Sequence, residues 1–145
     1  MRRTRLFLMS LLLGLVVGAG PLGAQEDSAG PMAAAIRGVI SQQLDAFRRD
    51  DGVGAFKFAS PGIRQQFGTA EVFMQMVRSA YQPVYRPREV EFRDLQLDGG
   101  RIVQRVFLVG PDGNPVIARY YMEPQDDGSW RIGGCLLERA PDQSA

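Results

Sequence analysis

Histidine is missing from this chain altogether, and cysteine occurs once, as Cys135. Without histidine the chain cannot form a Ser-His-Asp or Cys-His catalytic site. It also lacks the residue that most often serves as general base near neutral pH and as metal ligand. A lone cysteine excludes an intramolecular disulfide and leaves a thiolate metal site without partners. Cys135 is then a free thiol, half of an intermolecular disulfide, or a small apolar side chain on a strand, the interpretation we favour. The sequence predicts no metal and no cofactor, and leaves any catalysis to carboxylates, tyrosines or arginines.

Long apolar runs are also scarce, and the one that exists lies at the start of the chain. It covers residues 6–20, fewer than the roughly 20 residues that a helix needs to span hydrocarbon. Three arginines precede it, and small residues ending at Ala24 follow it. This order is that of a secretory signal peptide, so we expect cleavage after Ala24, a periplasmic or secreted protein, and no stable membrane insertion afterwards. An uncleaved anchor is the alternative.

Loss of this leader changes the charge balance. The full chain has 17 basic and 16 acidic residues; without the three leader arginines, 17 becomes 14 against 16, a net charge near −2. No block of like charge exceeds two or three residues, so we expect no nucleic acid and no anionic membrane as partner. The remainder is the size of one ordinary domain. We expect residues 1–24 as signal peptide, 25–30 as a polar stub, 31–140 as a single domain and 141–145 as a C-terminal tail.

The first half of the expected domain has the apolar spacing of helices. Between Pro31 and Arg49, apolar residues recur at intervals of three and four, which predicts one long amphipathic helix. Shorter helical segments follow, with the caps and breakers Asp50 or Asp51, Ser60-Pro61, Gly68 and Thr69. The last segment is expected to turn Phe73, Met76, Val77 and Ala80 inward. Prolines at positions 83 and 87 end the helical half.

From Arg88 onward the apolar period changes to two, which indicates strands. We expect strands over residues 88–97, 102–109, 116–123 and 130–137, joined by Gly-, Pro- and Asp-rich turns. An out-of-phase step predicts a bulge near Arg93-Asp94. The predicted fold class is α+β, with N-terminal helices packed on one face of a curved four-stranded antiparallel meander.

This order of elements, ending in DGSWRI, resembles the nuclear-transport-factor-2-like (SnoaL-like, cystatin-like) α+β cone. More closely, the chain resembles an uncharacterised proteobacterial family of signal-bearing proteins in that superfamily, over nearly all of the part after the leader. The matching stretches are QQLDAFRRDD (42–51), AFKFASPGIRQQFG (55–68), YQPVYRPREVEF (81–92) and DGSWRIGGCLL (127–137). The resemblance implies a cone with a pocket between sheet and helices. It implies no reaction, because the superfamily contains isomerases, dehydratases and binding modules.

Strand faces predict what lines such a pocket. An unpaired buried charge costs several kcal/mol, so the uncharged set of the third strand should face inward: Val116, Ala118, Tyr120 and Met122. The same argument turns Trp130, Ile132, Gly134 and Leu136 inward and leaves Arg131 and Cys135 outside. On the second strand we place Gln104 inside, because glutamine is cheaper to bury than Arg105.

The predicted pocket therefore has three polar groups, Gln104, the Tyr120 hydroxyl and the Trp130 indole N–H, with Tyr81 or Tyr85 closing its mouth. The alternative is that these buried groups only satisfy one another. Other side chains have similarly double interpretations. Met74 and Met76 are expected as core filler rather than ligand lining, and arginines 86, 88 and 105 either clamp a carboxylate or form a solvated face.

No acidic residue has the pattern of a tuned general base. Asp45 is expected in solvent, Asp50 and Asp51 are explained as caps, and the direction of Asp94 stays open. We therefore favour an exported, non-enzymatic module that binds a small apolar ligand or a protein partner, with a homodimer through the sheet face left open. The alternative is a SnoaL-like lyase or isomerase with an Asp/Tyr pair in the pocket.

Overall fold

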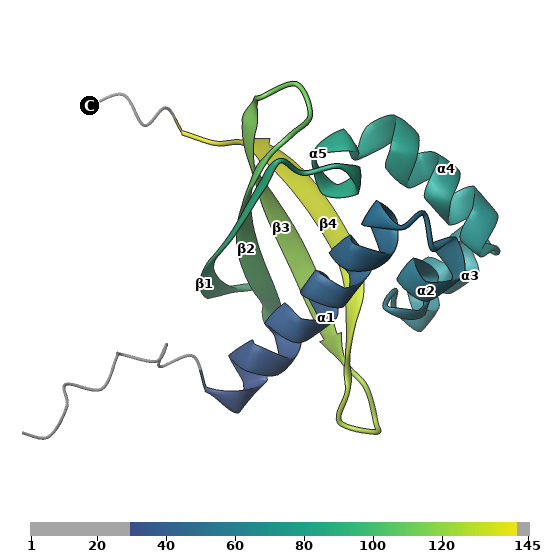
Figure 1. Ribbon diagram of the computed structural model, residues 1–145. Helices are drawn as coiled ribbons and strands as arrows, with labels where there is room; N and C mark the ends of the chain where they lie inside the picture. Colours follow the sequence, from purple (N-terminus) through teal and green to yellow (C-terminus); the bar gives the residue numbers. More distant parts are fainter. Residues whose placement is uncertain (1–29, 142–145) are drawn as a thin grey trace, which may run out of the picture.

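Residues 30–141 are described by a computed structural model, in which five helices precede four strands (Figure 1). This confirms the α+β class. The predicted signal peptide, the stub through residue 29 and the tail from residue 142 lie outside the described residues. Within residues 30–141, no helix has both the length and the hydropathy to cross a bilayer. The elements are α1 Pro31–Arg48, α2 Gly52–Lys57, α3 Pro61–Phe67, α4 Ala70–Ala80, α5 Gln82–Tyr85, β1 Glu89–Asp98, β2 Arg101–Val109, β3 Pro115–Pro124 and β4 Trp130–Arg139.

The sheet is an antiparallel meander of order β1-β2-β3-β4, twisted, with the helices gathered on one of its faces (Figure 1). The β1–β2 turn uses Gly99 and Gly100 at φ 57° and 80°, the left-handed conformation that glycine adopts without a Cβ penalty. The register of β1 against β2 shifts between Phe92 and Leu95. The predicted bulge near Arg93-Asp94 is therefore confirmed.

A second bulge, in β4, was not predicted. Pairing with β3 advances from Tyr121 opposite Gly134 to Met122 opposite Ile132, so Gly133 is the extra residue. A Cβ on Gly133 would come within 2.7 Å of the Glu123 side chain, which explains why the position suits glycine.

This bulge moves the inward face of β4 by one residue. Trp130, before the bulge, packs against the core as predicted. Beyond it, Cys135 packs against the core and Leu136 is 52% exposed. The prediction that Gly134 and Leu136 face inward and Cys135 outward is wrong, because an inserted residue reverses the two-residue alternation.

The core lies between α1, α4 and the inner face of the sheet. Its largest members from α1 are Ile36, Ile40, Leu44 and Phe47, and the inward residues of β3 join them as predicted. Each such fully buried side chain contributes about 1.5–3 kcal/mol relative to exposure. On α4, Met74 is buried and Ala80 is exposed, so the expectation that Ala80 faces inward is wrong.

The ends of the short helices show which acids are caps. Asp51 caps α2 by accepting from the Gly54 amide at 2.9 Å, and the solvent position of Asp45 is confirmed. Asp50 does not cap α2. It has a positive φ of 54°, and its carboxylate turns toward α5 instead. That short helix was not predicted, although a proline in the first helical turn, here Pro83, is compatible with helix.

Two backbone hydrogen bonds join the segment between α2 and α3 to the edge strand β4. The Ile132 amide donates to the Phe58 carbonyl and the Ser60 amide donates to the Ile132 carbonyl, both at 2.8 Å. They hold α3 beside β4 and cover this part of the sheet edge. The space enclosed by α3, α4, α5 and β4 contains the site described next.

Candidate functional site

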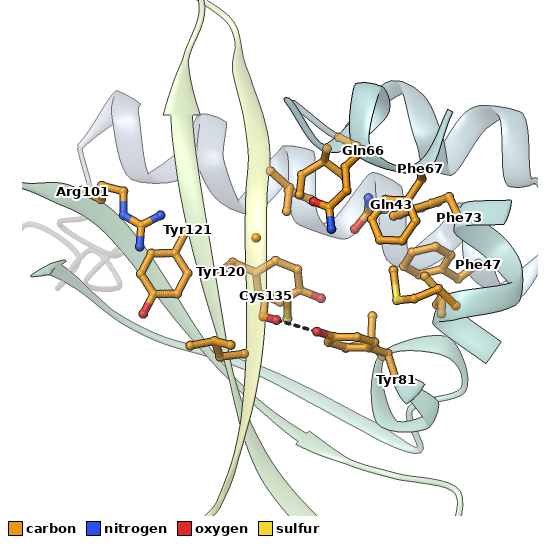
Figure 2. A pocket seen from close by; sticks show the side chains of 18 residues that line it. Gln43, Phe47, Gln66, Phe67, Phe73, Tyr81, Arg101, Tyr120, Tyr121 and Cys135 are labelled. Carbon is orange, nitrogen blue, oxygen red and sulfur yellow. Dashed lines mark hydrogen bonds between the residues drawn. The ribbon is translucent and has the colours of Figure 1, made fainter. Parts of the chain in front are cut away.

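A cavity of about 440 Å³ lies between the helices and the β3–β4 end of the sheet (Figure 2). This volume is in the range of small-molecule sites, about 300–1,000 Å³. Gln66 and Leu136 are exposed residues of its lining, so they lie at its rim. Most of the lining is apolar and comes from all the helices except α2: Phe47, Ile63, Phe67, Phe73, Met76, Val77 and Val84, with Ala59, Ile132 and Leu136.

An aromatic cluster forms the helical wall of the cavity. The Phe73 ring of α4 lies 5.7 Å from that of Phe67 and 6.2 Å from that of Phe47, centroid to centroid, and Phe56 packs behind it at 5.3 Å. Aromatic pairs at these separations contribute about 0.5–1.5 kcal/mol beyond the area they bury. The wall is therefore built from rings of α1, α3 and α4 that pack against one another, with the Phe56 ring of α2 behind them.

The Tyr120 hydroxyl is the polar group on the sheet side. Tyr120 is 1% exposed, lines the cavity, and its hydroxyl has no hydrogen-bond partner within residues 30–141. Its ring lies on the helix side of β4 (Figure 2). Burial raises the pKa of Tyr120 well above its usual value, so the group stays protonated and can donate. A buried hydroxyl without a partner is uncommon in folded proteins and costs stability.

Tyr81 and Cys135 lie next to Tyr120. The Tyr81 hydroxyl donates to the Cys135 carbonyl at 3.0 Å, which ties the start of α5 to β4 (Figure 2). Cys135 is a free cysteine, and burial raises its thiol pKa to about 12. A thiol that stays protonated at neutral pH is a poor nucleophile and metal ligand. This is the environment of a small apolar side chain on a strand, the interpretation favoured from the sequence.

A surface cluster of Asp50, Arg78, Tyr85 and Arg86, here called the Asp50 cluster, holds α5 against the end of α1. The Tyr85 hydroxyl donates to Asp50, and Arg86 donates to the other Asp50 oxygen at 3.0 Å and to the Phe47 carbonyl at 2.6 Å. The Arg86 guanidinium also lies 3.8 Å from the Tyr85 ring centroid.

Charge and hydrogen bonding in the Asp50 cluster stabilise the Asp50 carboxylate. The hydrogen bond from Tyr85 lowers the pKa of Asp50, against an opposing effect of burial, and the charges of Arg86 and Arg78 add to it. Because α5 contributes Val84 to the lining, the cluster positions one wall of the cavity without touching its interior.

Of the five side chains predicted for the pocket, Tyr81 and Tyr120 line the cavity and Gln104, Trp130 and Tyr85 do not. Gln104 is inward, as predicted, but its amide donates to the carbonyls of Arg93 at 2.7 Å and Arg105 at 2.8 Å. It therefore supports the β1 bulge. Tyr85 belongs to the Asp50 cluster, and Trp130 packs against the core elsewhere.

Within the described part of the chain, no Asp or Glu lines the cavity. Two Asp/Tyr pairs exist in this part of the chain. Tyr85 with Asp50 lies outside the lining. Tyr121, which donates to Asp98 at 3.0 Å, belongs to the lining but lies across β4 from the helices (Figure 2), and both carboxylates are exposed. Asp94 is exposed and accepts from Arg105 at 2.7 Å, which settles its direction. Among residues 30–141, no three acidic or cysteine side chains converge as metal ligands.

Several lining residues escaped the sequence analysis. The phenylalanines of the wall belong to apolar helix stripes, which look the same whether they face a filled core or a cavity. Met76, expected as core filler, also lines the cavity. Cys135 was placed on the wrong face, although the Gly133-Gly134 pair inside a strand is a recognised sign of a bulge.

The fold and the cavity together define an α+β domain with helices on one face of an open antiparallel sheet and a mainly apolar pocket between the layers. The chain belongs to the family described as domain of unknown function DUF4864, whose model matches residues 29–145. No curated protein matches the chain. The family establishes relatedness and no activity.

Proposed function

We propose that this domain is a non-enzymatic module that binds a small, largely apolar molecule in the cavity between the helices and β4. The observation that carries the proposal is the Tyr120 hydroxyl, buried in an apolar lining without a partner in the described structure. Apolar walls with few placed polar groups are typical of small-molecule sites. A ligand that supplies the missing partner would account for both the space and the orphan hydroxyl.

The alternatives have less support from the geometry. A lyase or isomerase needs a proton acceptor within hydrogen-bond reach of its substrate, and the described lining offers no carboxylate. A partner on the outer sheet face would meet arginines that already have acids beside them. Arg119 contacts Asp98 at 2.9 Å and Glu138 at 3.1 Å. These ion pairs would have to be desolvated or rearranged on docking.

Titration with the neutral fluorophore N-phenyl-1-naphthylamine tests the proposal. We expect saturable binding with one site per chain. Met76→Trp, which puts an indole into the lining, should weaken it at least about tenfold, equivalent to ~1.4 kcal/mol. Val72→Trp, on the exposed face of the same helix, is the matched control and should leave binding unchanged. Absence of saturable binding, or equal binding by both variants, would contradict a site in this cavity.

We also propose that the domain acts after export, supported by the basic, apolar and small-residue segments of residues 1–24. Intact-mass measurement on a periplasmic extract should then find Gln25 at the N-terminus. Recovery of the full-length chain from the membrane fraction would favour the uncleaved anchor instead.

A further inference from the structure

We propose that the ligand of this cavity is uncharged and carries a hydrogen-bond acceptor, a carbonyl or ether oxygen, which accepts a hydrogen bond from the Tyr120 hydroxyl. This inference rests on the proposed function and narrows it to a chemical class. It makes Tyr120 the residue that selects the ligand, while the aromatic wall supplies most of the binding energy.

The requirement for an acceptor follows from the state of the Tyr120 hydroxyl. Its pKa is raised by burial, so it is protonated at any physiological pH and can donate. Within residues 30–141 no acceptor reaches it. The neighbouring Tyr81 hydroxyl is already committed, because it donates to the Cys135 carbonyl at 3.0 Å. Of these two buried tyrosines, Tyr120 is therefore the one whose hydroxyl is free to donate to a ligand.

The requirement for neutrality follows from the charges around the cavity. Arg101 is the one charged side chain in the described lining, and it lies on the other side of β4 from the helices (Figure 2). Its guanidinium carbon is 4.1 Å from the centroid of the Tyr121 ring, so it is stacked away from the interior. An anion or a cation beside Tyr120 would be buried unpaired, which costs several kcal/mol.

A neutral ketone fits what remains. Phe67, Phe73 and Phe47 offer ring edges and faces to an aromatic or alicyclic body, and the Tyr120 hydroxyl lies on the sheet side of the cavity, on β3. The volume of about 440 Å³ accommodates a bicyclic compound. The exposed Gln66 at the rim leaves a polar substituent of such a ligand in contact with water.

Three naphthalenes of matched shape test this inference: 2-acetylnaphthalene with an acceptor, 2-ethylnaphthalene without one, and the 2-naphthoate anion. Calorimetry gives each dissociation constant for the wild-type protein, Tyr120→Phe and Tyr121→Phe. The ratio of the dissociation constant of the hydrocarbon to that of the ketone should be about two- to tenfold larger in wild type than in Tyr120→Phe. This factor is what one neutral hydrogen bond contributes to affinity. Ligand hydration cancels in this comparison. Naphthoate should bind at least about 100-fold more weakly than the ketone.

The controls separate this inference from the proposed function. Tyr121→Phe removes the hydroxyl of the next residue, which lies across β4 from the helices (Figure 2) and already donates to Asp98 at 3.0 Å, so the ratio should stay at the wild-type value. If ketone and hydrocarbon bind but Tyr120→Phe leaves their ratio unchanged, the acceptor requirement is overturned and the binding function stands. Naphthoate binding as tightly as the ketone overturns neutrality. If no naphthalene binds and N-phenyl-1-naphthylamine does not either, the proposed function itself fails.

Discussion

Replacing Tyr120 by phenylalanine should leave the ligand-free protein as stable as before or make it more stable. The substitution keeps the ring that packs in the core and removes only a buried hydroxyl with no partner in the described structure. Burying such a group costs about 1–3 kcal/mol in protein mutational data. Partial hydration of the cavity reduces that cost, so we expect the free energy of unfolding to rise by 0 to about 2 kcal/mol. For a domain of this size, each kcal/mol raises Tm by about 4 °C.

Tyr121→Phe is the matched control, because the same change one residue away removes a hydroxyl that does have a partner. The Tyr121 hydroxyl donates to Asp98 at 3.0 Å. Asp98 is exposed, so we expect a loss of only about 0.5–1 kcal/mol. Urea denaturation, after unfolding, removal of bound molecules and refolding, gives both values. An unchanged m-value shows that the unfolded state is not responsible.

A loss of about 1 kcal/mol or more in Tyr120→Phe would refute this reasoning. It would mean that the hydroxyl has an intramolecular partner. The Oε1 atom of Gln104, which lies opposite Tyr120 in the β2–β3 pairing and is itself buried without a partner in the described structure, would be the acceptor. A ligand would then need no acceptor to satisfy the Tyr120 hydroxyl.

Three further outcomes follow from the structure. Hydrogen bonding from Tyr85 lowers the pKa of Asp50, so its carboxylate stabilises the fold above the ordinary Asp pKa range, and this stabilisation is lost as the pH falls through the lower pKa of the folded state. The difference in unfolding free energy between wild type and Asp50→Asn should therefore shrink toward zero in urea melts taken from about pH 7 to about pH 2.5. A difference that stays constant over this range would contradict the prediction. Leu137→Ala should lower the free energy of unfolding by about 2 kcal/mol and Leu136→Ala by under about 0.5 kcal/mol in the same assay, because Leu137 packs against the core and Leu136 is exposed. The opposite ranking would contradict the bulge in β4. With a thiol pKa of about 12, Cys135 should react with a disulfide reagent at pH 8 at least about tenfold more slowly in the native than in the urea-unfolded protein, and equal rates would show an exposed thiolate.

Local signals in the sequence were sufficient for the elements and their order. The long amphipathic stripe of α1, the caps Ser60 and Thr69, and the glycine turn after β1 each depend on a few neighbouring residues, and the structure has all of them. The β1 bulge was predicted because the phase of the apolar residues changes around it. The β4 bulge was missed, because Gly133 and Gly134 have no side chain whose polarity could mark the change of phase.

The candidate site was predicted less well, because a cavity is the space that side chains from distant elements fail to fill. The inward direction of Gln104 followed from the cost of burying a charge, but its amide partners lie on β1, where strand pairing brings the bulge carbonyls of Arg93 within reach. Likewise, the position of Asp50 before a helix predicts a cap, because its actual partners Arg86 and Tyr85 lie 36 and 35 residues further along the chain and only the fold brings them beside it.

The sequence by itself determined the layers of this protein, since alternation and helical periodicity state which side of each element is apolar. It also determined what chemistry is absent, because a chain without histidine and with one cysteine cannot assemble the sites that need them. Only the tertiary structure decided which apolar faces meet and which stay apart. The Ile132 backbone bonds and the Asp50 cluster hold α3 and α5 at positions where the side chains of four helices and the sheet leave about 440 Å³ unfilled beside Tyr120. That volume depends on the packing of all these elements at once, and no short stretch of sequence encodes it.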